Sequence, residues 1–174
     1  MSLHSTTPFG SYIVPAVASR LGVTSYRKFQ LARFGFALQN AALVAFIVGA
    51  MQRIIGGRRP ELVALMALAF TPLLGFEVGT IAPNGTETLA IVGFAAWLLV
   101  GLRNSDSRAV LISGCLGALA CLMRDVAFIG VCVSAAAVVV ATPKRRQRWS
   151  AMGKRARRSA LAIVGAGLVW GFVW

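Results

Sequence analysis

The chain has 174 residues, of which 57% are hydrophobic and only 13% charged, and its mean hydropathy is +0.75. This is more apolar than a soluble domain of this length needs to fill one core. Eighteen Lys and Arg against five Asp and Glu give a formal net charge of +13. The basic residues stand in short clusters between apolar stretches, so they form no continuous basic face for a phosphate backbone. The composition argues against nucleic-acid binding and favours a membrane protein.

Histidine and cysteine give no sign of a metal site. His4 is the only histidine, and Cys115, Cys121 and Cys132 lie inside apolar stretches without a C-x-x-C pair. Cysteines placed in this way are typical of small buried hydrophobic residues rather than of a zinc site or a disulfide scaffold. The residues themselves indicate no metal and no cofactor.

The N-terminal segment 1–32 precedes the first long apolar run and lacks the continuous apolar core of a signal peptide. We expect it to lie at the membrane interface, with a short helix over 9–21 that ends near Gly22. Transmembrane helices are then expected over 33–174.

Six stretches without Asp, Glu, Lys or Arg predict these helices, at 34–52, 62–76, 88–102, 109–123, 126–143 and 159–174. Several have only 15 residues, which at about 1.5 Å per residue is shorter than the roughly 30 Å hydrocarbon core. Flanking arginines must then extend to the headgroups, or some segments are half-spans. We predict an all-α, polytopic transmembrane helix bundle of about six short spans in a single membrane-embedded domain, 1–174.

The loops predict the orientation, because Lys and Arg are retained on the cytoplasmic side during insertion. The connections after the first, third and fifth runs are basic: they contain Arg53, Arg58 and Arg59; Arg103 and Arg108; and eight Lys and Arg between 143 and 158. If every run spans, the connections 77–87 and 124–125 face outward. The basic residues before the first run would then also lie outside, against the rule. The 143–158 loop either only sets the orientation or also binds anionic headgroups.

Few ionisable residues are expected at membrane depth, and these few are the candidate catalytic or binding residues. Arg124 and Asp125 form either an ordinary outer turn or a buried pair whose guanidinium binds a lipid phosphate. Glu77 and Glu87 bracket the outer loop 78–86. A carboxylate there can act as a general base or hold a metal, although two solvated loop acids explain the same spacing.

Polar residues on one span suggest a helix contact. Arg33 and Asn40 are seven residues apart, on one helical face, with Gln39 beside them. Such residues usually hold helices together, and otherwise line a substrate path. The sequence Asn84-Gly85-Thr86 fits a glycosylation site and fits a turn equally well.

The stretch from Thr71-Pro72 to Ala82-Pro83-Asn84-Gly85-Thr86-Glu87 resembles bacterial polytopic membrane proteins of the domain of unknown function family 2142, which is related to the GT-C membrane glycosyltransferases. In that family a span ends in Thr-Pro and an outer loop carries an Asn-Pro-Asn/Asp-Gly-like motif. Here Ala82 stands where the first Asn is often found. The run from Thr7 to Tyr12 is similar to the family's His-Pro-Pro-x-Tyr-Tyr-like segment, and Arg124 resembles an Arg that precedes a later short span.

The resemblance implies transfer of a sugar from a polyprenyl-phosphate donor at the outer face of a bacterial plasma membrane. Arg124, Asp125 and Asn84 would lie near the donor, and a divalent metal could assist. The essential acid of such enzymes follows their first span, yet no acid precedes Glu61 here. We therefore expect a fragment of a larger protein, without the catalytic loop and inactive alone.

Two other interpretations remain open. One is a transporter or a subunit of a membrane complex, with a membrane protein partner and no catalysis. The other is a reading frame without present activity.

Overall fold

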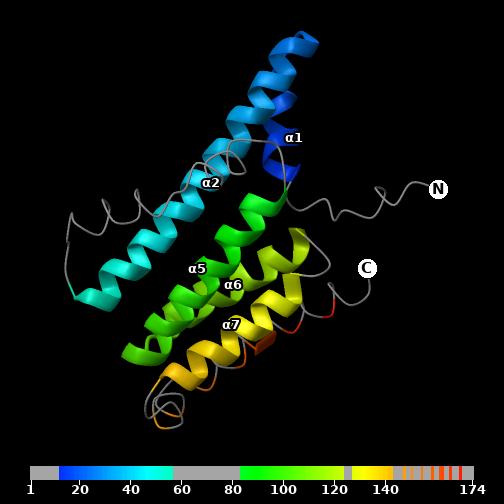
Figure 1. Ribbon diagram of the computed structural model, residues 1–174. Helices are drawn as coiled ribbons and strands as arrows, with labels where there is room; N and C mark the ends of the chain where they lie inside the picture. The colour runs from blue at the N-terminus through cyan, green and yellow to red at the C-terminus, as the bar shows by residue number, and fades with distance from the viewer. Residues whose placement is uncertain are drawn as a thin grey trace.

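The computed structural model describes residues 12–56, 83–123 and 127–142, together with residues 147, 150, 154, 158, 161, 162, 165 and 169. Across these residues the regular structure is helical throughout, without a strand. The helices, seen in Figure 1, are α1 (Ile13–Ser19), α2 (Ser25–Ile55), α5 (Pro83–Asn104), α6 (Ser107–Met123) and α7 (Ala127–Ala141). The all-α prediction is confirmed for this part of the chain.

Four of the six charge-free runs coincide with helices. The run 34–52 lies within α2, 88–102 within α5 and 109–123 within α6, while 126–143 contains α7. The run 62–76 lies outside the described residues, as does most of 159–174. By length and composition α2 and α5 are able to cross a membrane, a property shared by buried core helices of soluble proteins; α6 and α7 are shorter apolar helices.

The N-terminal segment differs in detail from the expectation. Helix α1 is shorter than the predicted 9–21 helix. Helix α2 begins at Ser25 and continues without a break through residue 33, where the transmembrane part was expected to start. The Thr24 hydroxyl accepts a hydrogen bond from the Arg27 backbone N–H at 3.3 Å, so the cap sets the start of the helix. Residues 25–33 include neither Gly nor Pro, and their charged side chains do not interrupt the helix.

A stripe of buried residues runs along α2 at spacings of three and four: Phe36, Asn40, Leu43, Ile47 and Ala50. This spacing places the stripe on one helical face, which packs against α5.

Helices α2 and α5 run parallel to each other. Asn40 contacts Thr86, Ile47 lies beside Gly93, and Gly49 lies beside Trp97, so the contacts advance together along both helices. Figure 1 shows the same arrangement, with α1 packed against the opening turns of α2. The end of α2 and the start of α5 therefore lie at opposite ends of the pair.

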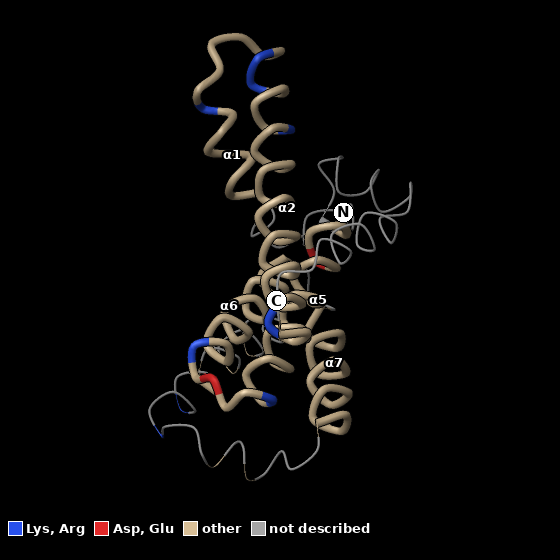
Figure 2. The backbone as a smooth tube through the Cα atoms, turned by 90° about the vertical axis from the view of Figure 1, so that its left-hand side faces the viewer, with Lys and Arg blue, Asp and Glu red and all other residues tan. Residues whose placement is uncertain are grey.

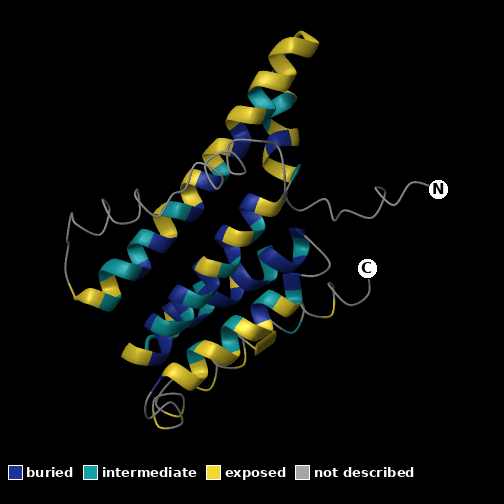
Figure 3. Cartoon of the chain, viewed as in Figure 1, coloured by how far each residue is buried: buried dark blue, intermediate teal, exposed yellow. Residues whose placement is uncertain are grey.

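Helices α5, α6 and α7 form the rest of the bundle. A two-residue corner, Ser105-Asp106, reverses the chain between α5 and α6, and the Asp106 carboxylate caps α6 by accepting the Arg108 backbone N–H at 2.9 Å. Gly101 lies beside Val110 and Gly117 beside Phe94, so these two helices are antiparallel and closely packed. Figure 3 shows buried residues between α5, α6 and α7.

The outer surfaces of the helices are also apolar. Helix α7 has no charged residue and exposes Ile129, Val133 and Val140. Helix α2 exposes Phe34 and Leu38 on the side away from its buried stripe, and Phe46 on the flank beside α5. Helices with apolar residues on both faces are typical of a hydrocarbon environment or a larger protein core.

The close approach of α5 and α6 at Gly101 gives a stability prediction. A Cβ at this position would lie 3.0 Å from the Val110 backbone nitrogen, which cannot move without displacing α6. We expect Gly101→Ala to lower the free energy of unfolding by about 1–3 kcal/mol, measured by thermal unfolding of the purified chain followed by circular dichroism.

Gly49→Ala is the matched control, because its Cβ would make an ordinary contact 3.8 Å from Trp97. Alanine favours helix over glycine by roughly 0.8–1 kcal/mol, so this variant is expected to be neutral or more stable. Equal destabilisation of both variants would contradict the α5–α6 packing.

Candidate functional site

A buried polar pair joins α2 to α5. The Thr86 hydroxyl donates a hydrogen bond to the Asn40 side-chain oxygen at 2.7 Å, and both residues are 0% exposed. Such a bond contributes roughly 0.5–1.5 kcal/mol net, while leaving either polar group unpaired would cost more. The pair therefore fixes the depth at which α5 sits along α2.

The other two polar residues predicted on this face behave differently. Arg33 is exposed, with its guanidinium 5.9 Å from the centre of the Phe29 ring. Arg33 continues the stripe of Asn40 towards the N-terminus of α2. Helix α5 begins near the level of Asn40 and does not reach Arg33. Gln39 is partly buried, and both polar atoms of its side chain are shielded from solvent without a hydrogen-bond partner among the described residues. The structure brings Asn40, and not Arg33, into contact with α5.

Glu77 and Glu87 were expected to bracket an outer loop, 78–86, that contains Asn84. This expectation is wrong for residues 83–86, which belong to helix α5. Pro83 begins α5, because its fixed φ and missing N–H suit the first turn of a helix. Asn84 is exposed in that turn, and its carbonyl accepts the Thr88 hydroxyl at 2.9 Å. Glu87 lies one turn further on, partly buried. The turn predicted from Asn84-Gly85-Thr86 is therefore the start of a helix.

Three predicted residues fall outside the described part of the chain: Glu77, Arg124 and Asp125. Since α5 and α6 are antiparallel, Met123 at the end of α6 lies at the same end of the bundle as Asn84 and Thr86. Arg124 follows Met123 directly in the sequence.

The opposite end of the bundle is basic. Arg53 ends α2, Arg103 ends α5 and Arg108 starts α6, and all three are exposed. Figure 2 shows basic residues around this part of the molecule and at the tip formed by α1 and α2. Between these two groups, α2 carries no charged residue from 34 to 52. Asp106 is the acid that the described residues provide at this end; Glu87 lies near the other end of α5.

Arg53 is held by two contacts. Its Nη1 lies 3.4 Å from Asp106 Oδ2, and its guanidinium carbon lies 4.9 Å from the centre of the Trp97 ring. Trp97 is itself fixed, because its indole N–H donates to the Phe46 carbonyl at 2.9 Å. The Arg53 side chain remains 53% exposed, so this cation is oriented by Trp97 without being buried.

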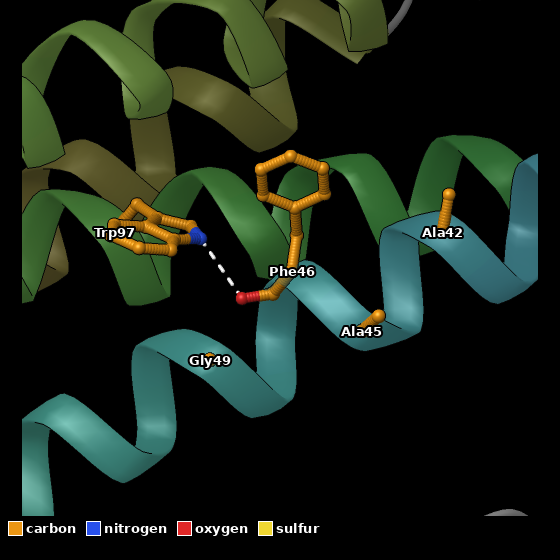
Figure 4. Close-up of a pocket in the computed structure, with 5 residues that line it drawn as sticks. All are labelled: Ala42, Ala45, Phe46, Gly49 and Trp97. Carbon is orange, nitrogen blue, oxygen red and sulfur yellow. Dashed lines mark hydrogen bonds between the residues drawn. The ribbon is translucent and has the colours of Figure 1, made fainter.

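An open apolar groove adjoins this cation. It has a volume of about 320 Å³ and is lined by Ala42, Ala45, Phe46, Gly49 and Trp97, as Figure 4 shows. The small side chains of α2 leave the space, and the Phe46 and Trp97 rings, whose centres are 6.5 Å apart, form its aromatic wall. The groove was not predicted from the sequence. The available signal was Trp97, which stands six residues before Arg103, since Trp favours the membrane interface.

Within the described ranges, no group of three or more His, Cys, Asp or Glu side chains is placed to hold a metal ion. Comparison with protein-family models gives no match to this chain. Neither the curated proteins nor the solved structures give a match.

The Asn40–Thr86 bond yields a direct test. Thr86→Val keeps the shape of the side chain and removes the donor, so we expect it to lower the free energy of unfolding by about 1 kcal/mol. The double variant Asn40→Leu/Thr86→Val should cost less than the sum of the single changes, as determined by chemical unfolding of the purified variants.

Thr88→Val serves as the control, because the exposed Thr88 hydroxyl donates to the Asn84 carbonyl of its own helix. Its cost should stay within about 0.5 kcal/mol. Strictly additive effects of the Asn40 and Thr86 changes would show that the two residues are not coupled.

Proposed function

We propose that the chain is a multi-pass protein of a bacterial plasma membrane, part of a bundle of about six spans. The observation that carries this proposal is the apolar outer surface of the bundle, above all the charge-free exposed face of α7. Hydrocarbon accepts such a face without cost, whereas water does not.

The parallel packing of α2 and α5 supports an additional span between them. Gly56 follows the end of α2 at the basic end, and Pro83 starts α5 at the opposite end. A chain that joins two parallel spans has to cross the bilayer an odd number of times. The charge-free run 62–76 supplies the residues for one crossing. In this arrangement Arg53, Arg103 and Arg108 share the cytoplasmic side.

For the activity we propose a part of a GT-C-like glycosyltransferase that uses a polyprenyl-phosphate sugar donor. The support is the resemblance around Thr71-Pro72 and Pro83 to Glu87, together with the position of Met123, the residue before Arg124 in the sequence, at the same end of the bundle as Asn84. Glu87 and Asp106 belong to opposite ends of α5, so the described carboxylates form no catalytic pair. The chain is then a scaffold of the donor site that lacks its own base.

The second candidate is a transporter or a subunit of a membrane complex. One observation favours it: the enclosed Gln39 amide has no hydrogen-bond partner, and a polar group from another helix would satisfy it. The Asn40–Thr86 bond favours the first candidate, because a substrate path would leave these polar groups facing water rather than each other.

The membrane topology gives a test in cells. We expect Asn84→Cys to react with a membrane-impermeant maleimide in intact bacteria, and Asn104→Cys to react only after permeabilisation, because the arginine-rich end stays in the cytoplasm. Both positions are exposed, at the two ends of α5. The three native cysteines are replaced by alanine in each variant, and labelling is read by mass shift.

The parent chain without added cysteines is the control for background labelling. Equal reaction of the two variants in intact cells would contradict the topology. Recovery of the chain in the soluble fraction after lysis would contradict the membrane placement itself.

The transferase proposal predicts that these 174 residues alone do not transfer a sugar. The purified chain is incubated in lipid with a radiolabelled polyprenyl-phosphate sugar and membrane acceptors, and we expect product no higher than in lipid without protein. Transfer above this blank would contradict a missing base. Loss of that transfer in Glu87→Gln would then identify Glu87 as the base.

A further inference from the structure

We propose that the groove between α2 and α5 binds an anionic phospholipid, with its phosphate at Arg53 and the first part of one acyl chain along Ala42, Ala45 and Gly49. This inference rests on the proposed placement in a membrane, and it adds a ligand that the proposed activity does not require.

The groove has the chemistry of an acyl-chain site. Its lining consists of aliphatic, glycine and aromatic residues, and it opens to the outside of the bundle rather than into its core. The residues from Ala42 to Gly49 cover about 10 Å of helix, enough for the part of an acyl chain next to the headgroup. The Phe46 side chain is 46% exposed along this path, so an acyl chain in the groove would cover its ring.

The charge at the end of the groove selects an anionic headgroup. Arg53 lies one helical turn beyond Gly49 and rests on Trp97, which also lines the groove. Arg103 and Arg108 lie at the same end, as the end of α5 and the start of α6. Against these three guanidinium groups, Asp106 is the carboxylate that the described residues provide there. Three cations against one carboxylate leave a net positive site, and one oxygen of Asp106 is also engaged by the Arg108 backbone N–H.

The single contact of Arg53 with the Asp106 carboxylate leaves guanidinium donors for a phosphate. The distance to Asp106 is 3.4 Å, and a single nitrogen-oxygen pair makes the contact. The remaining guanidinium donors of this half-exposed side chain are able to reach a phosphate oxygen, and an Arg fork binds phosphate through two nitrogens. A partner helix in the groove would have to place an acid against Arg53 to match this charge.

Quenching of Trp97 by brominated lipids tests the proposal. The chain with Trp149, Trp170 and Trp174 replaced by Phe is reconstituted into phosphatidylcholine vesicles that contain a small fraction of a phospholipid brominated on its acyl chains. We expect brominated phosphatidylglycerol to quench Trp97 with an apparent affinity at least roughly fivefold higher than brominated phosphatidylcholine. High salt should reduce this preference.

Two arginine variants locate the headgroup. Arg53→Gln is expected to abolish the preference for phosphatidylglycerol, whereas Arg53→Lys should keep a part of it. Arg20→Gln, an exposed arginine at the far tip of the molecule, should leave it unchanged. Equal quenching by both lipids in the parent chain, or an undiminished preference in Arg53→Gln, would overturn the proposal.

A separate reporter keeps failure of the lipid site distinct from failure of the membrane placement. Val133→Trp with Trp97→Phe, in the same background, puts the fluorophore on the exposed face of α7. Quenching of this reporter by brominated phosphatidylcholine without quenching of Trp97 would mean that protein covers the groove, against the proposal. If neither tryptophan is quenched, the chain does not lie in the bilayer, and both proposals fall.

Discussion

The parallel packing of α2 on α5 is the constraint on which the rest of the structure depends. Two hydrogen bonds set it: Thr86 to Asn40 near one end and Trp97 to the Phe46 carbonyl near the other. Between them, the apolar stripe of α2 fills the space against Leu89, Ala90 and Phe94. A shift of one helix along the other by a single residue would break both bonds. The depth and the rotation of α2 are therefore fixed together, and so is the position of Arg53 beside Asp106.

Much of the helical structure was predictable, because an absence of charge over 15 residues is a strong signal. The residues at which the helices begin were harder to predict. Thr24, Pro83 and Asp106 begin α2, α5 and α6 through capping and fixed φ, and these local effects do not depend on where charges stop. This is why α2 starts eight residues before 33, and why the predicted outer loop ends at the latest before Pro83.

The polar residues show where sequence reasoning stops. Asn40 was identified as a residue that holds helices together, but its partner Thr86 was not, because the two are 46 residues apart in the sequence and meet only through the parallel pairing. Arg33 shares the helical face of Asn40, and yet none of the described contacts of α5 includes it. The groove beside Trp97 depends on the same pairing. Spacing along one helix predicts which residues share a face, whereas the neighbouring helix decides what that face meets.

Helix α2 is long in relation to a bilayer. Its 31 residues extend over about 46 Å, half as much again as the roughly 30 Å hydrocarbon thickness. The excess lies at its N-terminal end, where α1 packs against Gly35 through Ala18 and Val14. Arg27, Lys28 and Arg33 occupy these turns. In the proposed membrane placement these cations would resist immersion, so hydrophobic mismatch would act on the α1–α2 tip. Because α2 is one continuous helix, a change of bilayer thickness that tilts this tip would, in the proposed placement, also change the position of α2 against α5 at its other end.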